Sequence, residues 1–244
     1  MNPARTLATA GRILTQVRHD PRTIGLLLVV PSLLIGLLAW IFSDTPVFAV
    51  VGPAVLALFP FIAMFLVTSI TTLRERRTGT LERLLSMPLG RGDLILGYTL
   101  AFGLLAVLQS AIAVGYSVWV CGLEIRGSIW MLLAVAVADA VLGTTLGLLA
   151  SAFARTEFQV VQFMPALVFP QILLGGIFLS REQLPDVLRA ISDWLPLSHA
   201  IDALQAVATD TEDAAYVGGE LLIIGAWIVG AVVLGSITLR RRTP

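Results

Sequence analysis

The sequence predicts an all-α integral membrane protein with six transmembrane helices. Hydrophobic residues make up 57% of the chain, charged residues only 13%, and the mean hydropathy is +0.90. A bilayer core of about 30 Å needs roughly 20 apolar residues in a helix, and the chain has six such runs. They lack the apolar and polar alternation of a membrane barrel. We expect one membrane domain over 1–244, with spans at 24–42, 47–73, 94–123, 128–154, 158–179 and 216–239.

The arginines predict that both termini lie in the cytoplasm, because basic residues near span ends are retained on that side. All 16 basic residues are arginine. Six spans with both ends inside leave only Arg126, Arg181 and Arg189 outside, together with ten acidic residues. This distribution supports a membrane topology and gives no basic soluble face, so we expect no nucleic-acid partner.

The segment before the first span, 1–22, has the pattern of an amphipathic helix ending at Asp20 and Pro21. Its arginines suit anionic headgroups, so we expect it to lie on the inner membrane surface. A solvated tail is the alternative. A cleaved signal peptide fits poorly, because a long amphipathic stretch precedes the apolar run. The residues expected on the apolar side are Leu7, Ala10, Leu14 and Val17.

A charged segment, 74–91, separates the second and third spans. Leu81, Leu84 and Leu85 fall on one face of a short helix, and the charged residues around them stay available to water or to a partner protein. We expect a cytoplasmic helix that receives force from a soluble motor. Its leucines would be anchors in a groove, with Glu75, Glu82 and Arg83 at the rim. The alternative is a helix under the membrane with its leucines among the headgroups.

The loop before the last span, 180–215, predicts two short amphipathic helices separated near Trp194 and Pro196. Either they form a cap or hairpin dipping into the outer leaflet, or they are an external loop docked on the bundle. Their apolar residues recur at spacings of three and four: Leu184, Val187, Leu188 and Ile191, then Ile201, Leu204 and Val207.

Polar residues inside the spans are candidates for a translocation path. Asp139 stands near the middle of the fourth span, where an ionised carboxylate costs several kcal/mol. We expect a neutral, hydrogen-bonded acid or one facing a wet cavity. It is either a site on the transport path or a packing residue that contacts Gln109, Ser110 or Gln171. Three glutamines of the fifth span, near two prolines, are the other path candidates, although helix packing also explains them: Gln159, Gln162 and Gln171.

Small and rare residues give weaker signals. Gly143 and Gly147 form a GxxxG pair, which permits close helix approach either inside the bundle or between two copies. Cys121 is the only cysteine and is expected to be a packing residue. His19 and His199 are far apart in this topology, so neither a metal site nor a Ser-His-Asp triad is predicted.

Two segments resemble the ABC-2 type permeases, the membrane subunits of ABC transporters, and particularly their small drug-exporter and nodulation-factor-exporter branch. ERRTGTLERLLSMPLGRGDLILGY (Glu75 to Tyr98) is similar to the family's loop between spans two and three. GGIFLSREQLPDVLRAISDWLPLSHAIDAL (Gly175 to Leu204) is similar to its external segment. With the six-span layout, the resemblance covers essentially the whole chain.

The resemblance implies a half-transporter. Two copies, or this chain and a paralogue, would pair with two ATP-binding subunits, and a coupling helix would sit in a groove of the ATPase. The implied coupling residues are Glu75, Arg76, Gly79, Thr80, Leu81, Glu82, Arg83, Leu84, Leu85 and Met87.

The chain has no lysine and therefore no P-loop. We expect no catalytic residue, cofactor or metal in it, with ATP and Mg bound by the partner subunit. The sequence thus predicts the permease of an ATP-driven exporter in the bacterial inner membrane. Its cargo would be amphipathic drugs or lipid-like compounds, or polysaccharide. The alternatives are a proton-coupled secondary transporter that uses Asp139 and, less favoured, a membrane-embedded enzyme.

Overall fold

The computed structural model describes residues 3–79, 91–179 and 181–240. Every regular element within these ranges is helical, which confirms the all-α fold class. The elements are α1 (Pro3–Arg18), α2 (Pro21–Ile24), η1 (Gly25–Val29), α3 (Val30–Ile41), α4 (Val47–Arg77), α6 (Arg91–Gly115), η2 (Tyr116–Val120), α7 (Ile129–Phe153), α8 (Glu157–Leu174), η3 (Arg181–Gln183), α9 (Asp186–Ser192), α10 (Pro196–Thr209) and α11 (Ala214–Arg240).

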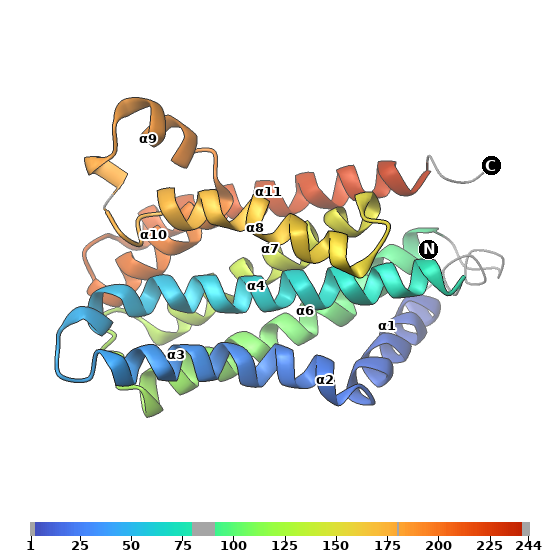
Figure 1. The fold of residues 1–244 in the computed structure, drawn as a ribbon, viewed down its shortest axis with the longest axis horizontal. Helices are drawn as coiled ribbons and strands as arrows, with labels where there is room; N and C mark the ends of the chain where they lie inside the picture. The colour runs from blue at the N-terminus through green and yellow to red at the C-terminus, as the bar shows by residue number, and fades with distance from the viewer. Residues whose placement is uncertain (1–2, 80–90, 180, 241–244) are drawn as a thin grey trace.

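Six of the described helices are long and apolar enough to cross a bilayer, so this is a multi-pass membrane protein. They are Pro21–Ile41, Val47–Arg77, Leu96–Val120, Ile129–Phe153, Glu157–Leu174 and Ala214–Gly235. The first of these joins α2, η1 and α3, and the third joins most of α6 to η2. Figure 1 shows them running along the long axis of the bundle, with α1 near one end and α9 and α10 at the other. We call these the α1 end and the α10 end.

Two boundaries differ most from the expected ones. The second span continues without a break to Arg77, so 74–77 belong to α4 and not to a separate short helix. The fifth span ends at Leu174, five residues before the expected end, because Gly175 caps α8 and Gly176 has a φ of +85°. A glycine in this left-handed conformation is a common way to end a helix.

Helix α4 lies at the centre of the bundle and packs most closely against α7. A Cβ atom on Gly143 would lie 2.5 Å from the backbone oxygen of Phe61, and one on Gly147 would lie 2.5 Å from that of Phe65. The two helices therefore approach backbone to backbone, which only glycine permits here. The GxxxG pair is used inside the subunit.

Helix α1 packs along α6 at the α1 end. The side that it buries is Thr6, Thr9, Ala10, Ile13 and Val17. This corrects the expected apolar side, because Leu7 is 64% exposed. The expected break is confirmed, since Asp20 caps α2 by accepting hydrogen bonds from the backbone N–H groups of Arg22 and Thr23. Placement of α1 on a membrane surface stays a prediction.

The two short helices expected before the last span are present as α9 and α10, and Pro196 is the first residue of α10. They differ in environment. Helix α10 is docked in the bundle, with Ile201, Leu204 and Val207 all buried. Helix α9 stands away from the bundle in Figure 1, and Val187 and Ile191 are exposed. Helix α10 is therefore docked on the bundle, and its depth relative to the outer leaflet stays a prediction.

Candidate functional site

The last turn of α4 carries three consecutive charged residues that hold other parts of the bundle. Glu75 is only 3% exposed and accepts two hydrogen bonds from Arg12 of α1, at 3.0 and 3.3 Å. A buried carboxylate needs such a partner, because removing it from water unpaired costs several kcal/mol. Helix α1 is thus fixed to the end of α4.

Arg12 also reaches α6. Its Nη2 atom donates to the hydroxyl of Tyr98 at 3.3 Å, while Tyr98 itself is buried. One guanidinium group therefore contacts both helices that flank residues 80–90. Burial of Glu75 corrects its expected place on the rim of a partner-binding surface. The sequence pattern did not identify Arg12 or Tyr98 as part of this site.

Arg74 and Arg76 extend the contacts of this turn. Arg74 pairs with Glu157 at the start of α8, at 2.8 Å, and lies 3.7 Å from Asp20, the residue that caps α2. The hydroxyl of Thr23 is the main reason that the pKa of Asp20 is lowered. Arg76 donates to the backbone oxygen of Ser151 near the end of α7 at 2.7 Å. Elements α1, α2, α7 and α8 are thus all linked to one turn of α4.

Of the remaining expected coupling residues, only Gly79 lies in the described part of the chain. Gly79 has a φ of +71° and ends the helical path directly after α4. The residues beyond it lie outside the described ranges, so the anchor face stays a prediction: Thr80, Leu81, Glu82, Arg83, Leu84, Leu85 and Met87.

Asp139 lies on α7 with no exposed surface. Neither of its carboxylate oxygens has a hydrogen-bond partner among the described residues, and the same is true of the amide of Gln109 on α6. The other two expected packing partners of Asp139 bond elsewhere. Ser110 donates to the backbone oxygen of Ala136, and Gln171 joins α8 to α10 by accepting from the N–H of Leu197 at 3.0 Å.

The three path glutamines do not gather at one place. Gln159 is near the start of α8, where its side chain accepts from the N–H of Arg155 at 2.8 Å. Gln162 is exposed on the surface of the helix, and Gln171 is buried against α10. Within a single chain they form no common lining, so a shared path through them requires a second subunit.

A second group of charged residues lies at the α10 end. The Nδ1 atom of His199 lies 2.5 Å from a Glu220 oxygen, and Nε2 lies 3.0 Å from the backbone oxygen of Asp193. Because both nitrogens face acceptors, the ring is best satisfied as the imidazolium. Burial lowers the pKa of His199, but the hydrogen bond to Glu220 and the other favourable contacts outweigh it, so the net pKa is raised. Sequence reasoning gave His199 no role.

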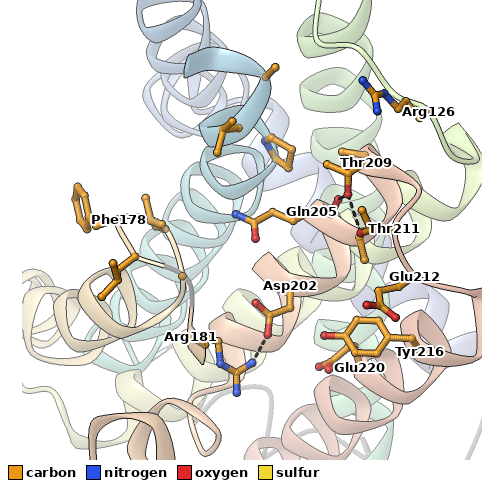
Figure 2. Close-up of a pocket in the computed structure, with 18 of the residues that line it drawn as sticks. Arg126, Phe178, Arg181, Asp202, Gln205, Thr209, Thr211, Glu212, Tyr216 and Glu220 are labelled. Carbon is orange, nitrogen blue, oxygen red and sulfur yellow. Dashed lines mark hydrogen bonds and ion pairs between the residues drawn. The ribbon is translucent and has the colours of Figure 1, made fainter. Parts of the chain in front are cut away.

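A cavity of about 900 Å³ lies beside this group. Figure 2 shows Arg181 pointing at Asp202, with Gln205 and Thr209 further along the same helix and Phe178 on the opposite side. Arg181 pairs with both Asp202 and Asp193. Burial raises the pKa of Asp202, and the attraction of Arg181 only partly offsets this. The cavity therefore combines paired charges with an apolar wall.

The family model of the ABC-2 type transporters matches residues 6–208. Among the relatives, the probable multidrug ABC transporter permease YbhS of Escherichia coli (strain K12) is 29% identical over 58% of this chain and 38% of its own length. The related permease YbhR is 27% identical over 64% of this chain and 43% of its own length. ABC transporter G family member 20 of Dictyostelium discoideum is 22% identical over 78% of this chain and 26% of its own length. The chain spans less than half the length of these relatives. Because the family model covers most of the sequence, the chain belongs to the ABC-2 type transporter family.

Proposed function

We propose that this chain is the permease subunit of an ATP-driven exporter in a bacterial inner membrane. It works with a second permease copy or a paralogue and with two ATP-binding subunits, which bind ATP and Mg, and its termini are cytoplasmic. The family match and the six spans support a transport role. Two relatives are named as probable multidrug permeases, which supports export of amphipathic compounds.

The observation that carries the proposal is the set of contacts made by the last turn of α4. Residues 78–90 follow this turn directly, so a force applied to them reaches Arg74, Glu75 and Arg76 first. These residues hold α1, α2, α7 and α8. Because Gly143 and Gly147 bring the backbone of α7 directly against that of α4, the two helices would move as one rigid body. A push at one loop would thereby rearrange the bundle.

The cargo follows from what the spans offer. Few fixed charges lie within them, so a hydrophilic solute would find little to bind, whereas an amphipathic drug or a lipid-like compound would be tolerated. The cavity at the α10 end has both an apolar wall and charged groups. Polysaccharide is the alternative cargo.

A proton-coupled secondary transporter is the second candidate function. The specific observation in its favour is Asp139, a carboxyl group buried inside α7 with both oxygens unpaired among the described residues. Buried acids of this kind are often proton carriers in membrane proteins. The family match favours the ATP-driven proposal over this one.

The proposal is tested by co-expressing this chain with the proteins encoded beside it and measuring whether an ATP-binding subunit co-purifies. Leu84→Asp places a charge on the expected anchor face, so we expect the ATPase to be lost from the complex. Ser86→Asp adds the same charge on the opposite side of the expected helix and serves as the control. Retention of the ATPase by both variants would refute the assigned docking face, and its absence from the wild-type complex would refute the exporter proposal.

A further inference from the structure

Arg12 occupies an unusual place, because it is on neither of the helices that flank residues 80–90 and yet contacts both. Two of its hydrogen bonds go to Glu75, on the last turn of α4. A third goes to Tyr98, two turns into α6. The residues that it joins are 63 and 86 positions away along the chain.

We propose that Arg12 is a positioning residue that holds the last turn of α4 and the first turns of α6 at a fixed separation, an inference that rests on the proposed function. We call these two parts the stems of the coupling segment. A segment that docks in a partner binds more tightly when its ends are already fixed, because less conformational freedom is lost on docking. The Arg12 guanidinium supplies that constraint from a third helix. Force from an ATPase would then enter α4 and α6 together.

The geometry requires the forked shape of arginine. Two parallel bonds to the carboxylate of Glu75 leave the outer edge of Nη2 for the hydroxyl of Tyr98. Lysine carries the same charge but offers a single compact ammonium group, which does not reproduce this planar arrangement. Arg12→Lys therefore separates the charge from the bridging geometry.

The attachment of α1 to α6 does not depend on Arg12. Apolar side chains hold that contact, with Ala10, Ile13 and Val17 in one buried cluster with Ala101 and Phe102. Thr9 also lies directly over Gly97, where a Cβ atom would come within 2.6 Å of it. Loss of Arg12 would thus leave α1 on α6 and release only the link to α4.

The Arg74 link at the α4 end is weaker than the Arg12 link. The side chains of Arg74 and Glu157 are 52% and 43% exposed, whereas that of Glu75 is 3% exposed. Exposed ion pairs contribute little and are screened by salt. The Arg12 link is therefore the one suited to persist through a transport cycle, while the Arg74 link is suited to break and reform.

The experiment measures the separation of the two stems. Spin labels are placed at Thr78→Cys and Leu100→Cys in a Cys121→Ala background, and double electron–electron resonance is recorded on the purified full-length permease with and without its ATPase. We expect Arg12→Ala and Arg12→Lys to widen the distance distribution about twofold, and permease-stimulated ATPase activity to fall about tenfold with the KM for ATP unchanged. Tyr98→Phe, which removes only the third bond, should give a smaller change in both.

Arg18→Ala is the matched control, because it removes an exposed arginine from the same helix and should change neither readout. The exchange Arg12→Glu with Glu75→Arg should recover part of the stimulation. A distance distribution unchanged in Arg12→Ala, or a widened one with full stimulation, would overturn the inference. If the wild-type permease stimulates no ATPase, the proposed function is refuted. The positioning role of Arg12 is then decided by the distance distributions alone.

Discussion

His199 is the residue whose protonation should set how stability depends on pH at the α10 end. Its charged ring is held by Glu220 and by the backbone of Asp193, with Arg181, Asp202 and Tyr216 nearby. The pKa of His199 is raised from its ordinary value of 6.5. A group with a raised folded pKa contributes its full stability below the unfolded pKa and loses it as pH rises through the folded one.

The permease in detergent should therefore lose thermal stability as pH rises above about 6.5, and His199→Gln should remove most of this dependence. We expect His199→Gln to cost on the order of 3 kcal/mol at acidic pH, because it leaves the carboxylate of Glu220 buried without its cation. The measurement is a melting curve at a series of pH values. His19→Gln, an exposed histidine, is the control, and the same pH profile in both variants would contradict this account.

Replacing Asp139 should not destabilise the protein, in contrast to replacing His199. Its oxygens gain no hydrogen bond from the described residues, so its polarity contributes nothing favourable to packing. Asp139→Leu should keep the melting temperature or raise it, with a gain of about 1–3 kcal/mol, because an unpaired buried polar group is removed. Asp139→Asn should transport normally. Loss of transport in a well-folded Asp139→Asn variant would instead support the proton-coupled alternative.

The pairing of Arg12 with Glu75 could not be predicted from the sequence. The charges of 74–77 predicted a partner-facing surface, and nothing local distinguishes the buried acid from its exposed neighbours. Burial of Glu75 is set by an arginine 63 positions earlier, and such pairing has no signature in the pattern of either segment. The same holds for His199 and Glu220, which lie on different helices.

At the scale of the element, α4 and α7 depend on glycine. Gly143→Ala would force a Cβ atom against the backbone of Phe61, which does not yield as a side chain would. We expect a loss of about 1–3 kcal/mol from overpacking, read as a lower melting temperature. Gly225→Ala on α11, where nothing lies within 4 Å of the added Cβ, should be neutral or stabilising. Equal effects of both changes would show that α4 and α7 are not in close contact.

The elements themselves were largely predictable, because each depends on nearby residues. Six apolar runs predicted six spans, since a lipid-embedded helix must be apolar along its length. Spacings of three and four predicted α9 and α10. What the spacing did not determine was their environment: Gln171 and the buried face of α10 place that helix inside the bundle. Likewise, the GxxxG pair predicted a close contact but not its partner.

At the scale of the whole molecule, the two ends of the bundle differ in how they are held. The α1 end is joined through one turn of α4, where Arg74, Glu75 and Arg76 link four elements. The α10 end is joined through Arg181 and His199, beside a large cavity. Such an arrangement suits a molecule that receives force at one end and changes the packing of the other.

We infer that this chain does not drive transport by itself and instead converts a force applied by its partner into rearrangement of its helices. The most direct measurement reconstitutes the permease in vesicles with and without its ATP-binding subunits and follows a fluorescent amphipathic cargo. We expect transport only when both the ATPase and ATP are present, with a proton gradient unable to replace them. Equal transport by the permease alone, driven by a pH gradient, would contradict it.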